Sequence, residues 1–148
     1  YRLPPFFENI GKRLIKSPKI YFYDVGLASF LLGIENELQL KTHPLRGHLF
    51  ETMMISEMLK QKYNQGKENN LLYYRDSNQV EIDLLIPNNH MYDAYEIKSS
   101  KTITKDFFKG FKSFEKSSEV SSKNIIYAGD VMRSQNNVDI HPYWKVKL

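Results

Sequence analysis

Three strand-like runs separated by two short turns constrain the fold of this chain more than any other feature. The runs cover 71–75, 80–86 and 91–98 and are rich in Leu, Ile, Val and Tyr. The turns at 76–79 and 87–90 contain Asp, Asn, Ser and Pro, which favour tight reversals between strands. The pattern therefore predicts a three-stranded meander in the middle of the chain.

Acidic residues alternate with apolar ones along the second and third runs. Because alternate side chains of a strand share one face, Glu81 and Asp83 point the same way, as do Glu96 and Lys98 on the next strand. A tight hairpin places Asp83 beside Glu96, although like charges that face each other destabilise a sheet. A divalent cation removes that repulsion, and Mg²⁺ binds one or two carboxylates together with water and phosphate. The pattern indicates a metal site at Asp83 and Glu96, with Lys98 beside the metal-bound water and Glu81 as a secondary candidate.

The segment 47–63 has the periodicity of a helix with one broad apolar face. That face consists of Phe50, Met54, Ile55, Met58 and Leu59. Glu51 falls in the middle of the apolar arc, where an acid without a partner is costly. A structural ion pair would explain such a residue, but the acidic strands downstream favour a role in the site. Glu51 is therefore predicted to lean over the sheet toward the metal or toward Lys98.

The remaining segments flank this core. In chain order they are a strand at 19–23, a helix at 25–32, a loop at 39–46, an amphipathic helix at 102–116, a strand at 124–128 and an aromatic, basic tail at 138–148 with a further edge strand. From the Glu51 helix onward the order is αβββαβ. It predicts an α/β fold with a mixed central sheet flanked by helices, in one domain at 46–148 that follows an N-terminal lead-in at 1–45.

Composition narrows the possible chemistry. The chain has no cysteine, which excludes disulfides, a thiolate zinc site and a thiol nucleophile. Its apolar runs fall far short of the roughly 20 residues that cross a bilayer, and no export signal is evident, so we expect no membrane partner and a cytoplasmic location. The net charge of +4 is compatible with a polyanionic partner but is too small to argue for one.

Four stretches together resemble a known family. They are PPFFENIGKRLIKSPKIYFYDVGLASFLLGI, GHLFETMMISEML, LLYYRDSNQVEIDLLI and YEIKSSKT. A helical Glu51, Asp83 in VEIDLLI and the Glu96-Ile97-Lys98 triplet in YEIKSS resemble the PD-(D/E)XK nuclease superfamily. More narrowly, the chain is similar to the C-terminal domain of unknown function that follows the ATPase domain in many bacterial and archaeal AAA-type ATPases.

This resemblance implies a restriction-endonuclease-like core and metal-dependent hydrolysis of DNA phosphodiesters. It implies that Asp83 and Glu96 bind Mg²⁺ or Mn²⁺, with the backbone carbonyl of Ile97 as a further ligand. Glu51 would complete or orient that shell, and Lys98 would position the attacking water or stabilise the transition state. The phosphate loop GxxxxGK[ST] is absent, so the implied ATPase domain of the parent protein lies outside this chain.

One departure from the superfamily pattern keeps a second hypothesis open. Some relatives in the superfamily carry a Gln on the helix after the ExK strand, whereas here that helix reads DFFKGFKSFEK. The alternative is a catalytically inactive module that docks DNA or a protein, and a homo-oligomer is compatible with either hypothesis. A series of lysines in the same region is either the solvated face of a helix or a contact surface for DNA phosphates. The candidates for such contacts are Lys101, Lys105, Lys109 and Lys112.

Overall fold

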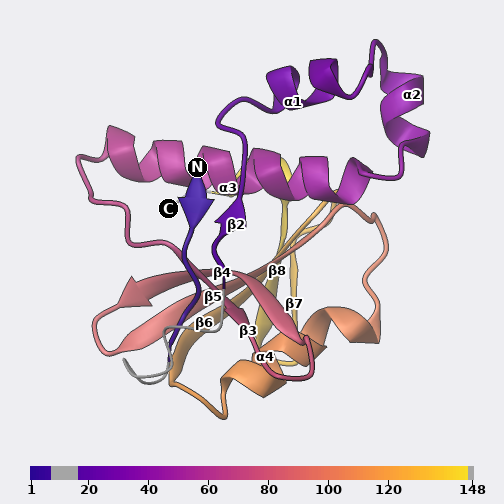
Figure 1. The fold of residues 1–148 in the computed structure, drawn as a ribbon. Coiled ribbons are helices and arrows are strands. Elements are labelled where there is room, and N and C mark those ends of the chain that lie inside the picture. Colours follow the sequence, from indigo (N-terminus) through magenta and orange to yellow (C-terminus); the bar gives the residue numbers. More distant parts are fainter. Residues whose placement is uncertain (8–16, 147–148) are drawn as a thin grey trace.

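A six-stranded mixed sheet lies between helix α3 on one face and helix α4 on the other (Figure 1). The computed structural model describes residues 1–7 and 17–146; residues 8–16 of the N-terminal motif and the last two residues of the predicted tail lie outside this range. The strand order is β3-β4-β5-β6-β8-β7. The sheet elements are β3 (Leu72–Arg75), β4 (Glu81–Asn88), β5 (Met91–Lys98), β6 (Val120–Tyr127), β7 (Arg133–Gln135) and β8 (Val138–Pro142).

The predicted meander is present as β3, β4 and β5, which pair antiparallel in sequence order. Its two turns use Gln79 and Asn89 in the left-handed region, at φ 64 and φ 56. From β5 the chain crosses over through a 3₁₀ turn, η2 (Lys105–Phe108), and α4 (Lys109–Phe114) to β6, which is parallel to β5. The connection over the sheet places α4 beside β4 and confirms the expectation of an α/β fold with a mixed sheet.

Apolar burial on both faces holds the sheet between the helices. Helix α3 (Arg46–Asn64) contributes Met54, Ile55, Met58 and Leu59 to one cluster, which also contains Leu84 and Ile97 of the sheet. The opposite cluster joins Phe111 and Phe114 of α4 to Ile82, Leu85 and Ile125. Each fully buried side chain of this kind contributes about 1.5 to 3 kcal/mol relative to an exposed one. Alternation is interrupted in β4, because Ile82 and Leu84, two residues apart, belong to opposite clusters and the β3–β4 register shifts beside them. The regular alternation expected for this run is therefore broken at Asp83, which lies between these two residues.

The N-terminal lead-in packs against the domain rather than trailing from it. Strands β1 (Arg2–Leu3) and β2 (Lys19–Ile20) pair antiparallel. Leu3 and Tyr21 belong to the same buried cluster as α3. The backbone N–H of Phe6 donates to the carbonyl of Tyr73 over 2.6 Å, which ties the segment to β3. The lead-in thus reaches the region where β3 and β4 carry their charged residues.

Several predicted boundaries differ from the observed ones. The expected loop at 39–46 overlaps helix α2 (Glu37–Thr42), which the side chain of Asn36 caps by accepting from the N–H of Gln39. The helix predicted at 102–116 is limited to η2 and α4. The tail strand β8 is inside the sheet, because β7 covers its outer side. The other helices are α1 (Val25–Leu31), capped by Asp24 as predicted, and the 3₁₀ turn η3 (Tyr143–Lys145).

Candidate functional site

Asp83, Glu96 and Lys98 meet where β4 and β5 cease to pair. The last pair in the ladder between the two strands is Leu84 with Tyr95, so the adjacent residues Asp83 and Glu96 are not paired in it. The Lys98 ammonium lies 3.1 Å from Oδ2 of Asp83 and 2.6 Å from Oε2 of Glu96. Asp83 is 7% exposed and Glu96 is 4% exposed. The structure therefore brings together the three residues predicted from the two strands, and it buries both carboxylates.

The Asp83 carboxylate also takes over the backbone pairing that β4 no longer provides. The N–H of Ile97 donates to Oδ2 of Asp83 over 2.7 Å. In an extended strand, the N–H and C=O of one residue point to the same side of the strand. The carbonyl of Ile97 therefore also points to the side where Asp83 lies. This direction is the one required of the predicted backbone ligand.

The two buried carboxyls have opposite pKa shifts. Burial alone would raise the pKa of Asp83, but the charges of Lys98 and Lys19 and the Ile97 N–H outweigh it and lower that pKa below its usual value. Burial, followed by the nearby Asp83 charge, raises the pKa of Glu96 well above its usual value in spite of Lys98. The attraction of Asp83 and Glu96 more than offsets burial for Lys98, whose pKa is raised. Relative to water, the site thus favours the charged form of Asp83 and disfavours the charged form of Glu96.

Gly110 allows α4 to approach the acids closely. A Cβ atom at this position would lie 2.2 Å from the carbonyl oxygen of Glu81, 2.3 Å from Oε1 of Glu96 and 2.7 Å from Cδ1 of Ile82. These separations are far below van der Waals contact, and the first partner is a backbone atom. Only glycine fits here, so the first turn of α4 forms one wall beside Glu96.

Glu51 belongs to a second charged group that meets the first at Asp83. Its Oε1 atom accepts a hydrogen bond from the Tyr21 hydroxyl over 2.5 Å and lies 3.1 Å from the Lys19 ammonium. No ion pair joins Glu51 to Lys98 within the described ranges. Glu51 does lean over the sheet from α3, as expected, but its direct partners come from the lead-in and not from β5.

Lys19 is the residue that sequence reasoning missed. Its ammonium lies 2.8 Å from Oε2 of Glu81, 3.1 Å from Glu51 and 4.0 Å from Oδ1 of Asp83. Burial would lower the pKa of Lys19, but the three carboxylates outweigh it and raise that pKa. The predicted strand at 19–23 already placed Lys19 and Tyr21 on one face. No local pattern in the sequence indicates where that face docks.

Glu81 also pairs with a cationic side chain of its neighbouring strand. Arg75 of β3 forms an ion pair with Oε1 of Glu81, and the two residues are opposite each other in the β3–β4 ladder. Lys19 contacts the other carboxylate oxygen of Glu81. This residue, a secondary candidate in the sequence, thus links the lead-in to the sheet.

Two hollows open beside this cluster, and both include Glu81 and Asp83. One, of about 400 Å³, also contains Glu96, Lys98 and Lys109. The other, of about 440 Å³, also contains Glu51, Lys19 and Tyr21 and is further lined by His48 and Arg75. A ligand in the first hollow reaches the β4–β5 acids from the α4 side, so this hollow is the candidate substrate site.

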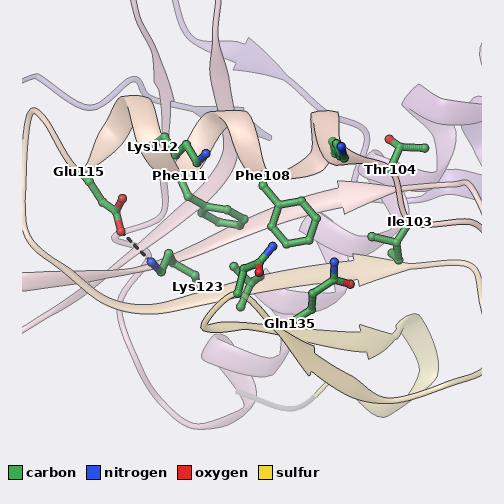
Figure 2. A pocket seen from close by; sticks show the side chains of 11 residues that line it. Ile103, Thr104, Phe108, Phe111, Lys112, Glu115, Lys123 and Gln135 are labelled. Atoms are coloured by element: carbon green, nitrogen blue, oxygen red, sulfur yellow. Dashed lines mark hydrogen bonds and ion pairs between the residues drawn. The ribbon is translucent and has the colours of Figure 1, made fainter.

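The four lysines predicted to contact nucleic acid do not gather at one place. Lys109 lines the candidate substrate hollow and pairs with Asp106 over 2.5 Å. Lys105 and Lys112 instead line a larger cavity of about 540 Å³, which lies between α4 and the β7–β8 region (Figure 2). Lys101 borders a different cavity, near α1 and α3. The larger cavity contains none of the candidate acids, so cavity size does not identify the site here.

The donor set at Asp83 and Glu96 fits a hard divalent cation. Two carboxylates and a backbone carbonyl are the oxygen ligands that Mg²⁺ and Mn²⁺ accept, with water and phosphate completing the shell. Burial and the neighbouring Asp83 charge raise the pKa of Glu96, even with the Lys98 ammonium 2.6 Å away. In the described part of the chain, no group of three His, Cys, Asp or Glu side chains is arranged to hold a metal.

The fold and site define a mixed α/β domain with a buried carboxylate–lysine cluster at the end of a β-hairpin. Residues 46–146 match the family described as "Domain of unknown function (DUF4143)", and the chain belongs to this family. Residues 1–38 match a second family, described as "Domain of unknown function (DUF8612)". The gap between the two matches, 39–45, lies at the end of the lead-in and includes most of α2.

Two curated relatives are similar to most of this chain. The uncharacterized proteins Rv2008c of Mycobacterium tuberculosis and Mb2031c of Mycobacterium bovis are each 32% identical to it over 129 residues. The match covers 87% of this chain but 28% of each relative, so the chain spans about 28% of the length of these relatives. No solved structure matches the chain. Among residues 1–7 and 17–146, no helix has the length and apolar character needed to span a membrane.

Proposed function

We propose that this domain hydrolyses DNA phosphodiesters with one bound divalent cation. The observation that carries the proposal is the pair of buried carboxylates, Asp83 and Glu96, held together by Lys98 at the end of the β4–β5 ladder. Burying two acids side by side is expensive. A structural role would be served more cheaply by apolar residues, whereas a divalent cation requires carboxylate ligands of this kind. The order α3, meander, α4, β6 agrees with a restriction-endonuclease-like core.

Each residue has a role in this proposal. Asp83 and Glu96 would hold the cation together with the carbonyl of Ile97. When bound, Mg²⁺ or Mn²⁺ offsets phosphate charge and lowers the pKa of a coordinated water. Lys98 donates toward the same place from a fixed position and would stabilise the charge that develops on the phosphoryl oxygens. Glu51 orients the shell indirectly, through Lys19.

The proposed partners follow from the same resemblance. DNA is the proposed substrate, and an ATPase domain of the same parent protein is the proposed partner. The relatives are several times longer than this chain, so the unmatched part of each relative is long enough to contain an ATPase domain. A cytoplasmic location belongs to this proposal, because DNA and ATP are both found there.

A non-catalytic module is the second candidate, and one observation favours it. Lys98 and Lys19 already neutralise most of the acids: Lys98 contacts Asp83 and Glu96, and Lys19 contacts Glu51 and Glu81. A site that is internally paired can be retained for structural reasons after catalysis has been lost. Such a module would bind DNA or a protein without needing a metal.

Metal dependence separates the two candidates. Single-stranded, duplex and branched DNA would be incubated with the protein in Mg²⁺, in Mn²⁺ and in EDTA, and cleavage and binding would be followed in parallel. We expect cleavage in either metal and none in EDTA, and no cleavage by Asp83→Ala. DNA binding of equal strength in metal and EDTA, without cleavage, would instead support the docking module.

A further inference from the structure

The lead-in holds Lys19 in a fixed position next to the acids. Strand β2 pairs with β1 in a register that sets Leu3 opposite Lys19. On either side of Lys19, the carbonyl of Ser17 accepts from the Tyr73 hydroxyl over 2.7 Å, and the N–H of Tyr21 donates to the carbonyl of Tyr1 over 2.8 Å. These bonds anchor the backbone before and after the lysine. The packing of the lead-in therefore sets the position of the Lys19 side chain.

The Lys19 ammonium occupies the place of a cation among three carboxylates. It contacts Glu51 and Glu81 directly and lies 4.0 Å from Oδ1 of Asp83, the oxygen that Lys98 does not contact. The ring of Tyr73 lies 5.3 Å from the ammonium and adds a cation–π contact. The Lys19 side chain is 19% exposed. A compact ammonium with three donors suits such a three-sided site.

Asp83 is shared by the two cationic positions. Its Oδ2 faces Lys98 and the Ile97 N–H, and its Oδ1 faces Lys19. In sites with two metal ions, the ions lie about 3.5 to 4 Å apart and commonly share ligands. Here Lys19 places a fixed positive charge beside Oδ1 of Asp83, where a second ion that shared this carboxylate would lie. That charge repels a second cation and supplies the neutralisation that the cation would bring.

We propose that Lys19 is a positioning residue that takes the place of a second divalent cation and so limits the site to the single cation of Asp83 and Glu96. This inference rests on the proposed function. It makes the lead-in part of the site, although the lead-in lies outside residues 46–146, which match the DUF4143 family. It also means that withdrawal of β2 would change how many cations the acids bind.

The test counts bound Mn²⁺ by electron paramagnetic resonance for the whole chain and three variants. Lys19→Met removes the charge, Lys19→Arg retains it, and Lys41→Met is the matched control, since Lys41 is 59% exposed in a helical pair with Glu37. We expect Lys19→Met to bind one more Mn²⁺ per chain than the wild type, and the other two variants to equal the wild type. An unchanged count in Lys19→Met, or the same gain in Lys41→Met, overturns the inference.

The same experiment separates this inference from the proposed function. A wild type that binds no Mn²⁺ contradicts the proposed function, while the difference between Lys19→Met and the wild type still decides the role of Lys19. Lys19→Met removes a mostly buried charge, so a second measurement that does not depend on the folding of this variant uses the wild type alone. Acetylation followed by mass spectrometry should modify Lys19 at least tenfold more slowly than Lys41, with and without Mg²⁺. Equal rates, or a Lys19 rate that rises on adding Mg²⁺, would show that the ammonium does not hold this place.

Discussion

Oδ2 of Asp83 accepts a hydrogen bond from the backbone N–H of Ile97 over 2.7 Å, so one side chain both ends the β4–β5 ladder and belongs to the candidate site. The same oxygen faces Lys98. Stability and the proposed function therefore depend on the same carboxylate. Substitutions at the site should change the free energy of unfolding in directions that the pKa shifts predict.

Asp83→Asn should destabilise the metal-free protein by about 1.5 to 3 kcal/mol at neutral pH, the scale of hydrogen bonds to charged groups. Burial opposes the charge of Asp83, but Lys98, Lys19 and the Ile97 N–H lower its pKa overall. A lowered folded-state pKa adds stability above the unfolded value of about 3.9, and this stability is lost as the pH falls through the folded value. Urea unfolding at pH 7 and at pH 3 should show the difference shrinking. Asp130→Asn, at an exposed position, is the control.

Glu96→Gln should have the opposite effect and stabilise the metal-free protein at pH 7 to 8. Burial and Asp83 raise the pKa of Glu96, so the folded protein resists ionising this group. Stability is therefore lost as the pH rises from the unfolded value of about 4.3 toward the folded one. The variant should gain about 1 to 3 kcal/mol at pH 8 and nearly nothing at pH 4. A variant less stable than the wild type at pH 8 would mean that Glu96 is stabilised by its Lys98 pair.

Gly110→Ala should destabilise the fold by about 1 to 3 kcal/mol, as overpacking does. The new methyl would clash with the carbonyl of Glu81 and with Oε1 of Glu96, and the backbone atom has little freedom to move. Gly47→Ala is the matched control, because its methyl would meet only Ser99 Oγ at 3.9 Å, and alanine favours a helix. Thermal unfolding of both variants checks this. Equal effects would show that α4 does not sit as close to the acids as described.

If lysines around η2 and α4 contact phosphates, the affinity for DNA should fall steeply with salt. Replacing Lys105, Lys109 and Lys112 together by Ala should then flatten that dependence. A control variant should remove the same charge from exposed positions elsewhere, namely Lys41, Lys60 and Lys67. Binding would be measured by fluorescence anisotropy over a series of salt concentrations. Equal slopes in both triple variants would leave these lysines as a solvated surface.

The strand pairs were predictable from the sequence because their information is local. Alternation and turn residues are properties of neighbouring positions, and they were enough to bring Asp83, Glu96 and Lys98 together. The periodicity of α3 likewise placed Glu51 over the sheet. Helix α2 was missed because its signal was a single capping residue, Asn36, in a polar segment.

The part of the site that the sequence did not reveal depends on a long-range contact. Lys19 and Glu51 are 32 residues apart, and Lys19 reaches Glu51 and Glu81 only after β2 has docked beside α3. Nothing in the local pattern at 17–23 distinguishes Lys19 from an ordinary exposed lysine. The position of β8 inside the sheet was missed for a different reason. The turn at Asn136 and Asn137 is local, but the strand before it, β7, has three residues and none of them is apolar.

The central claim is that Asp83 and Glu96 hold the cation while Lys98 acts on the reacting phosphate. The most direct measurement is a Mn²⁺ titration beside a DNA-cleavage time course for the wild type, Glu96→Ala and Lys98→Ala. Glu96→Ala should lose metal binding and cleavage together. Lys98→Ala should keep the metal and lose about 10² to 10³-fold in rate, the scale for one transition-state donor. A wild type that binds no divalent cation and cleaves no DNA, alone or within the longer parent protein, would contradict the account.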